Sequence, residues 1–276
     1  MHILQRGRSY VQKQTYPNLE KVLEEALRPS HLGDLSMSKH IWRGKWKGLA
    51  PDGDVHQRAR RIVRPTGGIV RGKFPSRKNG RMVHHEGLLE RDAIYLFEAS
   101  PQISRYREQP RTMHFPDGPR LRKYTPDFEL ELIGGELITV EVKPSRSLQN
   151  DEILHKFEAL AGYMHRLSAP FVILTEASIR IEPRLSSLRQ IYHRAARVPP
   201  TKGALKNSLM KHWASFPLPI ETASHLLQPD RIDPYSFLLA GELYCSLDTP
   251  VTLDTTLHIT SETHHEWFWI SKEHGF

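Results

Sequence analysis

Cysteine is nearly absent from this chain of 276 residues, which contains only Cys245. A single thiol cannot form a disulfide framework or a thiolate zinc site within one chain. Uninterrupted apolar runs of about 18 residues, the length needed for a transmembrane helix, are absent as well. The first residues lack the apolar segment of a secretory signal, so we expect a cytoplasmic protein.

The motifs of several enzyme classes are also missing. The chain has no GxGxxG or GxxxxGK(S/T) loop, which argues against dinucleotide-binding and P-loop enzymes. Adjacent histidines occur in Val83–His85 and in Thr263–Trp267, but neither pair has the HExxH spacing of a zinc protease. With 16 histidines in the chain, such clusters are expected by chance.

Positive charge is concentrated in one segment. The whole chain has a net charge of +8, but residues 39–83 contain thirteen Lys or Arg against two Asp, a local net charge of +11. Such a concentration attracts the phosphate backbone of a nucleic acid, whereas the alternative is a solvated basic arm. The residues that we expect to contact DNA are Arg60, Arg61, Arg64, Arg71, Lys73, Arg77, Lys78 and Arg81.

Apolar periodicity from residue 86 onward predicts an α/β domain. The expected elements are helices at 86–100, 151–167 and 186–195, strands at 102–110 and 170–176, and a hairpin over 124–144. Helices and strands in this order are typical of a mixed sheet flanked by helices.

Composition changes at Arg197–Gly203, so we expect a second, small domain after this linker. Within that domain, residues 235–259 predict a helix, a break at Gly241 and a small β element. The apolar residues of Leu209–Ile220 follow neither the helical nor the strand period, and they either fill a small core or form a protein interface. Near the N-terminus, Asn18–Leu27 predicts one helix.

The hairpin over Tyr124–Pro144 has an alternating pattern that constrains its register. Residues directly opposite each other share a face of a sheet, so burial selects a register that gathers the apolar side chains. With an odd loop or a glycine bulge at Gly134–Gly135, the expected pairs are Leu132–Ile138, Leu130–Val140 and Phe128–Val142. This register places Asp127 opposite Lys143 and diagonal to Glu141.

The end of this hairpin therefore gathers a polar patch of Asp127, Glu141 and Lys143. Two carboxylates this close repel each other unless a divalent cation lies between them. Oxygen ligands with an open coordination shell suit Mg²⁺ or Mn²⁺, and the lysine can orient or deprotonate a water molecule or stabilise phosphate charge. The alternative is a surface salt bridge, which is common and contributes little.

These residues carry a resemblance to a known family. Asp127 after Pro126, followed by Glu141-Val142-Lys143, resembles the PD-(D/E)xK nuclease motif. The segments "LLERDAIYLFEASPQISRYREQP", "YTPDF" and "VEVKP" resemble the N-terminal domain of TnsA, the endonuclease subunit of heteromeric cut-and-paste transposases. The resemblance covers about Arg60 to Glu176. It implies a restriction-endonuclease-like core over 56–198 and a small winged-helix-like domain over 199–276, with 1–55 unassigned.

The resemblance also implies a set of site residues. Glu90 would join Asp127 and Glu141 in holding the metal, with the Val142 carbonyl as a further ligand, and Lys143 would serve the attacking water. From the residues alone, Glu86 and Glu98 are equally open alternatives to Glu90. Gln109 also matches a family position, in a supporting or structural role.

The implied activity is magnesium- or manganese-dependent cleavage of DNA. By resemblance the chain would cut the 5′ ends of a transposon, while a TnsB-like DDE transposase processes the 3′ ends. A TnsC-like AAA+ regulator would bind through the C-terminal domain. The alternatives are a restriction or repair endonuclease with the same core, or a DNA-binding adaptor without activity.

Overall fold

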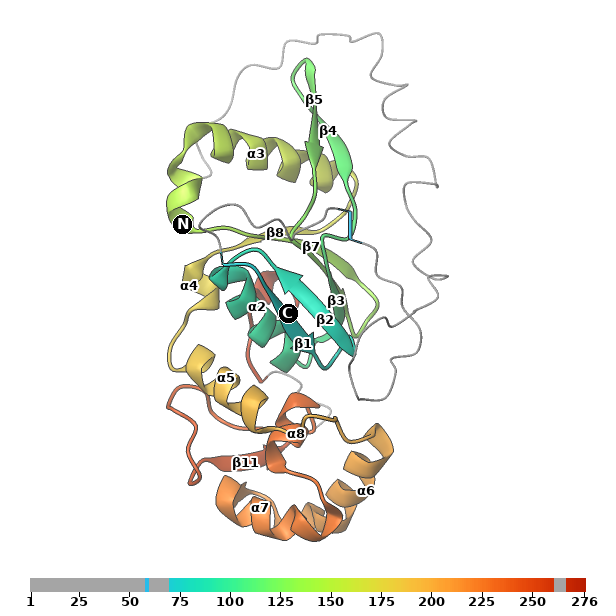
Figure 1. Cartoon of the computed structure of the whole chain (residues 1–276), viewed down its shortest axis with the longest axis vertical. Coiled ribbons are helices and arrows are strands. Elements are labelled where there is room, and N and C mark those ends of the chain that lie inside the picture. The colour runs from blue at the N-terminus through green and yellow to red at the C-terminus, as the bar shows by residue number, and fades with distance from the viewer. Residues whose placement is uncertain (1–57, 60–69, 261–266) are drawn as a thin grey trace. The chain divides into compact units, whose positions relative to one another are not determined.

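A four-stranded mixed sheet lies at the centre of the computed structural model, which describes residues 58–59, 70–260 and 267–276 (Figure 1). Its strand order is β3 (Ile103–Glu108), β6 (Phe128–Leu132), β7 (Leu137–Val142) and β8 (Phe171–Leu174). Strand β6 is antiparallel to both β3 and β7, whereas β8 runs parallel to β7. All described residues belong to one unit, Lys39–Phe276. The predicted helix at Asn18–Leu27 lies outside the described residues.

Both faces of this sheet are covered by helices. One face packs against α2 (Leu88–Ala99) and α5 (Arg184–Arg194) in a large apolar cluster. The other face packs against α3 (Asp151–Arg166), and α3 and α2 lie on opposite sides of the sheet in Figure 1. The prediction of an α/β domain with a mixed sheet between helices is therefore confirmed.

Helix α3 shows why the sequence folds in this way locally. Its N-cap is Asn150, whose side chain accepts hydrogen bonds from the N–H groups of Glu152 and Ile153. Acidic residues in the first turn and basic residues in the last turn complement the helix dipole. The buried residues Phe157, Leu160, Tyr163 and Met164 follow the helical period and face the sheet.

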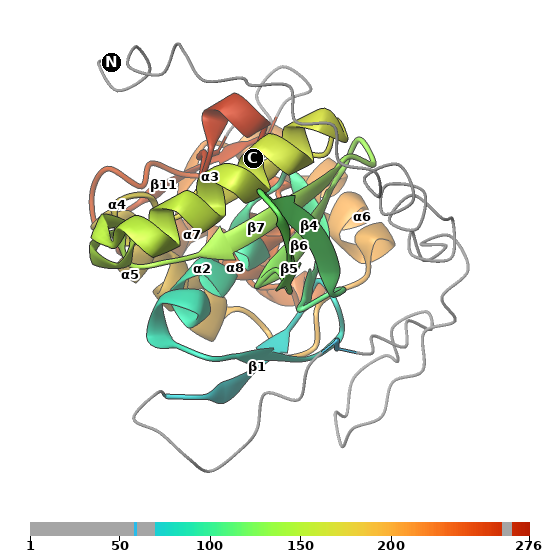
Figure 2. The same cartoon turned by 90° about the horizontal axis from the view of Figure 1, so that it is seen from above.

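Two separate β-hairpins flank the central sheet. The first consists of β1 (Gly72–Ser76) and β2 (Arg81–His85), and it packs on α2 through Phe74. The end of the basic segment is thus a folded part of the core. The second hairpin, β4 (Met113–Asp117) with β5 (Arg120–Tyr124), lies beside α3 (Figure 2).

The register predicted for the β6–β7 hairpin is wrong by two residues. The observed pairs are Phe128–Val140, Glu129–Thr139, Leu130–Ile138 and Glu131–Leu137. Leu132 N–H donates to Glu136 O, so only three residues, 133–135, form the loop. Gly135 adopts φ +92° there, a conformation that favours glycine. The same side chains share a face in both registers, but the tighter loop requires fewer ordered residues outside the ladder.

The C-terminal segment begins with α6 (Lys202–His212) and continues through a small three-stranded sheet and two further helices. Its elements follow in the order β9 (Leu218–Pro219), α7 (Ile220–Leu227), α8 (Pro234–Leu239), β10 (Leu243–Tyr244) and β11 (Thr256–Ile259). The sheet order is β10-β11-β9. A helix, a break at Gly241 and a small β element therefore occur as predicted. No helix among the described residues is long and apolar enough to cross a membrane.

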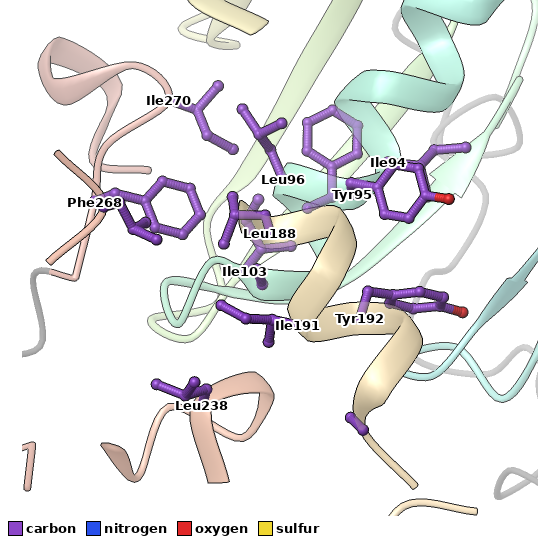
Figure 3. Packing of buried hydrophobic residues seen from close by; sticks show 14 of the residues in the cluster. Ile94, Tyr95, Leu96, Ile103, Leu188, Ile191, Tyr192, Leu238, Phe268 and Ile270 are labelled. Atoms are coloured by element: carbon purple, nitrogen blue, oxygen red, sulfur yellow. The ribbon is translucent and has the colours of Figure 1, made fainter. Parts of the chain in front are cut away.

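One apolar cluster spans the central domain and the C-terminal segment. Figure 3 shows Leu188 and Ile191 of α5 between residues of α2 and residues of the C-terminal segment, among them Leu238 and Phe268. The segment Leu209–Ile220, predicted either to fill a core or to form an interface, contains both buried and exposed residues. Both of its end residues are buried, whereas Trp213 is 57% exposed.

Candidate active site

The candidate site lies where β6 begins and β7 ends. These strands are antiparallel, so Asp127, just before β6, lies at the same end of the sheet as Glu141. Continuing the observed register by one pair places the two residues opposite each other, where the prediction had placed Lys143 opposite Asp127. The Val142 N–H donates to Asp127 Oδ2 at 2.9 Å, which fixes the Asp127 carboxylate against β7.

Glu141 is held by two donors. The Tyr124 hydroxyl donates to Glu141 Oε2 at 2.7 Å, and the Lys143 ammonium lies 3.1 Å from Glu141 Oε1. Glu141 is only 3% exposed, so these contacts supply the solvation that the carboxylate loses on burial. Burial, with the charge of Glu141 next, raises the pKa of Tyr124, so its hydroxyl remains a proton donor at neutral pH.

Glu90 joins this group from the first turn of α2. Its carboxylate accepts a hydrogen bond from the Glu86 N–H at 2.7 Å. Burial, together with the charges of Glu86 and Glu141, raises the pKa of Glu90 to about 7, although the Glu86 N–H opposes this shift. A carboxyl with this pKa changes its protonation state near neutral pH, as groups at functional sites often do.

The four residues expected from the resemblance thus form one electrostatic cluster. Burial, followed by the charges of Glu141 and Glu90, raises the pKa of Asp127 well above its usual range. Burial also disfavours the charged form of Lys143, but the carboxylates of Glu141 and Asp127 outweigh it and raise the Lys143 pKa. Three acids and one lysine therefore share a confined space, and the acids repel one another.

The donor set of this cluster fits a hard divalent cation. It offers carboxylate oxygens and the Val142 carbonyl, which points to the same side of β7 as the Val142 N–H that contacts Asp127. Oxygen donors of this kind suit Mg²⁺ or Mn²⁺. No three His, Cys, Asp or Glu side chains converge closely enough for metal ligation in the described ranges. One reason lies in the contacts, since the Lys143 ammonium occupies Glu141 Oε1.

The other two candidate glutamates have different environments. Glu98, near the far end of α2, is buried and accepts hydrogen bonds from Ser76 Oγ, the Tyr106 hydroxyl and the Arg77 N–H. These hydrogen bonds hold β1 and β3 against α2, so Glu98 has a structural role. Glu86 lies 3.9 Å from the Arg71 guanidinium and presents its N–H to Glu90.

Gln109 supports the site through its main chain. It adopts φ +46°, its N–H donates to Asp127 O, and its carbonyl accepts from the Ala59 N–H. A non-glycine residue with positive φ is uncommon and is held here by these main-chain contacts. Gln109 is buried and lies directly beside Asp127 in the fold.

The residues predicted to contact DNA fall into distinct groups. Arg77 donates to the carbonyls of Ala195 and Ala196, and Lys78 donates to those of Ser100 and Ile103. Burial lowers the pKa of Lys78 to about 8, despite the opposing charge of Glu98.

Arg81 forms an ion pair with buried Glu108, at 2.7 Å. Three of the predicted side chains, Arg77, Lys78 and Arg81, are thus engaged within the protein. By contrast, Lys73 is exposed on β1. Arg60, Arg61 and Arg64 lie outside the described residues.

Two residues near the site were not singled out from the sequence. Tyr124 contacts Glu141, and Lys156 lies over the rings of Tyr124 and Phe157, 5.3 Å and 5.1 Å from their centroids. A tyrosine three residues before Asp127 in the quoted "YTPDF" segment was a possible signal for the first. Lys156 has no local signal, because its position beside the site depends on how α3 packs.

Comparison with known proteins agrees with this geometry. Residues 100–176 match the family described as "TnsA-like endonuclease N terminal". The match includes Asp127, Glu141 and Lys143, whereas Glu90 lies ten residues before its start. No curated protein matches the chain in a sequence search. The resemblance stated from the motifs is therefore confirmed, and residues 100–176 of this chain are a TnsA-like endonuclease domain.

Proposed function

We propose that this chain is a metal-dependent DNA endonuclease that cuts the 5′ ends, the non-transferred strands, of a transposon during cut-and-paste transposition. The observation that carries the proposal is the cluster of Glu90, Asp127, Glu141 and Lys143 at one end of the sheet. Three of these four residues lie within the match to TnsA-like endonucleases. We further propose that the core is restriction-endonuclease-like and that the protein acts on DNA in the bacterial cytoplasm.

Asp127, Glu141, Glu90 and the Val142 carbonyl would hold Mg²⁺ or Mn²⁺. When bound, the ion supplies charge neutralisation for the phosphate and lowers the pKa of water. Burial, followed by repulsion between the carboxylates, raises the pKa of Asp127 and Glu90. This is the physical reason for the assignment, because a cation favours the ionised form of every carboxylate around it. Tyr124 keeps one oxygen of Glu141 in a fixed direction.

Lys143 acts as a cation in this proposal. Its raised pKa keeps the ammonium protonated at neutral pH in the arrangement described, so it orients the attacking water and stabilises phosphate charge. In the net reaction, the water oxygen bonds to phosphorus and the bond from phosphorus to the 3′ oxygen breaks. The products are a 5′ phosphate and a 3′ hydroxyl, which takes up the proton.

Contacts to the DNA backbone would come from the basic segment. Lys73 is exposed on β1, and Arg71 is half-buried directly before this strand. Together with Arg60, Arg61 and Arg64, these residues would bind phosphates with little sequence preference. Arg77, Lys78 and Arg81 belong to the fold instead, since their side chains bond to carbonyls and to Glu108.

The C-terminal segment would be winged-helix-like and would bind partner proteins. The element order α6-β9-α7-α8-β10-β11 with sheet order β10-β11-β9 supports the first part. Helix α8, in the place of a DNA-reading helix, is almost entirely buried and packs against α5 and α2. Residues 199–276 also contain nine Asp or Glu against five Lys or Arg. Both observations favour a protein partner, such as a TnsC-like AAA+ regulator, over DNA.

The test is a nicking assay on transposon-end DNA, with and without a TnsB-like DDE transposase and the TnsC-like regulator. We expect cuts at the 5′ ends only when the partners and Mg²⁺ are present, and none with Asp127→Asn. Efficient cutting of arbitrary DNA by the chain alone would instead indicate a restriction or repair endonuclease. Binding to transposon ends without any cleavage in the full assembly would indicate an adaptor.

A further inference from the structure

Lys156, in the second turn of α3, is fixed by aromatic contacts beside the candidate site. Its ammonium lies 5.3 Å from the ring centroid of Tyr124 and 5.1 Å from that of Phe157. The two rings pack edge to face, with their centroids 6.5 Å apart. The side chain is half-buried, so its aliphatic stem lies along apolar surface while the charged end reaches toward water.

The rings that hold Lys156 are shared with the catalytic cluster. The hydroxyl of Tyr124 donates to Glu141 Oε2 at 2.7 Å. The ammonium of Lys143 lies over the Phe157 ring as well, 5.9 Å from its centroid. Both ammonium groups therefore lie over the Phe157 ring, and the neighbouring Tyr124 connects Lys156 to the Glu141 carboxylate.

The charge of Lys156 is not matched by an acid in the part of the chain that the structure describes. Glu152 is four residues earlier on α3, at the spacing of a helical ion pair, yet no carboxylate lies within ion-pair distance of Lys156 among the described residues. Lys143 differs, because Glu141 lies against its ammonium. Lys156 thus presents an uncompensated, positioned cation next to the site.

We propose that Lys156 binds a phosphate oxygen of the DNA strand that lies across the candidate active site. A phosphodiester is the anion that such a site meets if the chain is a DNA endonuclease, so this inference rests on the function proposed above. The aromatic contacts reduce the rotamer freedom of the side chain before DNA binds, which lowers the entropy lost on binding. The contact is to the backbone and carries no sequence preference.

The experiment measures binding of the full chain to a transposon-end duplex by fluorescence anisotropy, in EDTA and at several salt concentrations. Lys156→Met keeps the stem and removes the charge, whereas Lys156→Arg keeps the charge. For Lys156→Met we expect affinity to fall roughly fivefold to tenfold near 0.1 M salt, and the slope of log K against log salt to fall by about 0.9. Lys156→Arg should restore most of both.

Arg166→Met is the matched control, because Arg166 lies at the other end of α3 over the ring of Tyr163, 6.0 Å from its centroid. This variant should bind like the unmodified chain. A lower melting temperature for Lys156→Met with an unchanged salt slope would show that Lys156 only packs on the rings, and would overturn the proposal.

The outcomes separate this inference from the proposed function. If the unmodified chain binds and cuts transposon ends and Lys156→Met has the same affinity and slope, the role of Lys156 is refuted and the nuclease stands. If the unmodified chain neither binds nor cuts DNA in the full assembly, both proposals fail. A loss of slope in Lys156→Met that Arg166→Met does not share supports the phosphate contact.

Discussion

Replacing Glu90 with Gln should stabilise the metal-free protein at alkaline pH. The folded state holds the pKa of Glu90 at about 7, above its ordinary value of 4.5, because of burial and the charges of Glu86 and Glu141. Below about pH 4.5 the Glu90 carboxyl is protonated in both the folded and the unfolded chain, so it does not change the free energy of unfolding. As pH rises from about 4.5 through 7, the unfolded chain ionises this carboxyl more readily than the folded chain does, so the free energy of unfolding falls until the folded chain has ionised it as well. The amide of the Glu90→Gln variant would remain neutral and could still accept the Glu86 N–H.

The magnitude follows from the size of this shift. Each pKa unit corresponds to about 1.4 kcal/mol, so ionised Glu90 lowers the free energy of unfolding by at most roughly 3.5 kcal/mol. Because the side chain is partly exposed and its charge is coupled to Glu141 and Lys143, we expect about 2 kcal/mol at pH 8.5. At roughly 2–4 °C per kcal/mol for a chain of this size, the melting temperature should rise by about 4–8 °C.

The assay is thermal unfolding in EDTA at pH 5 and at pH 8.5. Glu98→Gln is the matched control, since it makes the same change on the same helix. There both carboxylate oxygens accept hydrogen bonds, one from the Arg77 N–H and the other from the hydroxyls of Ser76 and Tyr106. The new NH2 group would replace one of these acceptors, so the change should destabilise the fold by about 1–3 kcal/mol at both pH values. A Glu90→Gln variant whose melting temperature does not rise at pH 8.5, or rises equally at pH 5, would contradict this prediction.

Three further predictions follow from the same contacts. Lys143→Ala should retain or strengthen Mg²⁺ binding, since the ammonium occupies a Glu141 oxygen, but lose most cleavage; calorimetry showing lost metal binding would contradict this. Tyr124→Phe should keep the ring under Lys156 and lower cleavage about tenfold, at a stability cost of about 1 kcal/mol; unchanged cleavage would count against Tyr124 as a positioning residue. A chain ending at residue 198 should lack a cooperative melt by circular dichroism, because it exposes the apolar face of α5; a sharp transition near that of the full chain would show an independent core.

Elements with strong periodicity could be predicted from the sequence, whereas the hairpin register could not. The helix expected at 151–167 is observed as Asp151–Arg166, because its apolar stripe and its Asn150 cap act locally. Alternation in β6 and β7 has a period of two, so a slip of two residues leaves every side chain on the same face. The length of the loop then selects the register. Alternation does not specify loop length, so it could not predict the three-residue loop that contains Gly135.

The sequence did not predict that the second face of the sheet is covered. Alternation along β6 would place the Glu129 side chain in solvent, but Glu129 is buried and lies 3.4 Å from the Arg111 guanidinium. The cover comes from Phe115, Tyr124 and Phe157, which belong to three different elements. Polar residues on an alternating strand predict solvent only where nothing packs over them, and that depends on tertiary contacts.

The residues of the candidate site could also be predicted only in part from local sequence patterns. Asp127, Glu141 and Lys143 could be proposed from spacing within one hairpin, because two strands joined by a short loop bring their ends together. Glu90 could be chosen over its neighbours only through the family resemblance. Its helix approaches the hairpin through packing of α2 on β7, which no local pattern encodes. Lys156, on α3, was missed for that reason too.

The linker at Arg197–Gly203 was interpreted as the start of a second domain, and the apolar cluster contains residues on both sides of this linker. A change in composition indicates where one group of helices and strands ends. It does not indicate whether the next group packs on the same apolar core. Here α8 and Phe268 complete the core that α5 shares with α2. Helix α2 carries Glu90 in its first turn. The C-terminal segment therefore packs against the helix that positions a site carboxylate. Removal of this segment would disturb the position of α2, and with it the candidate active site.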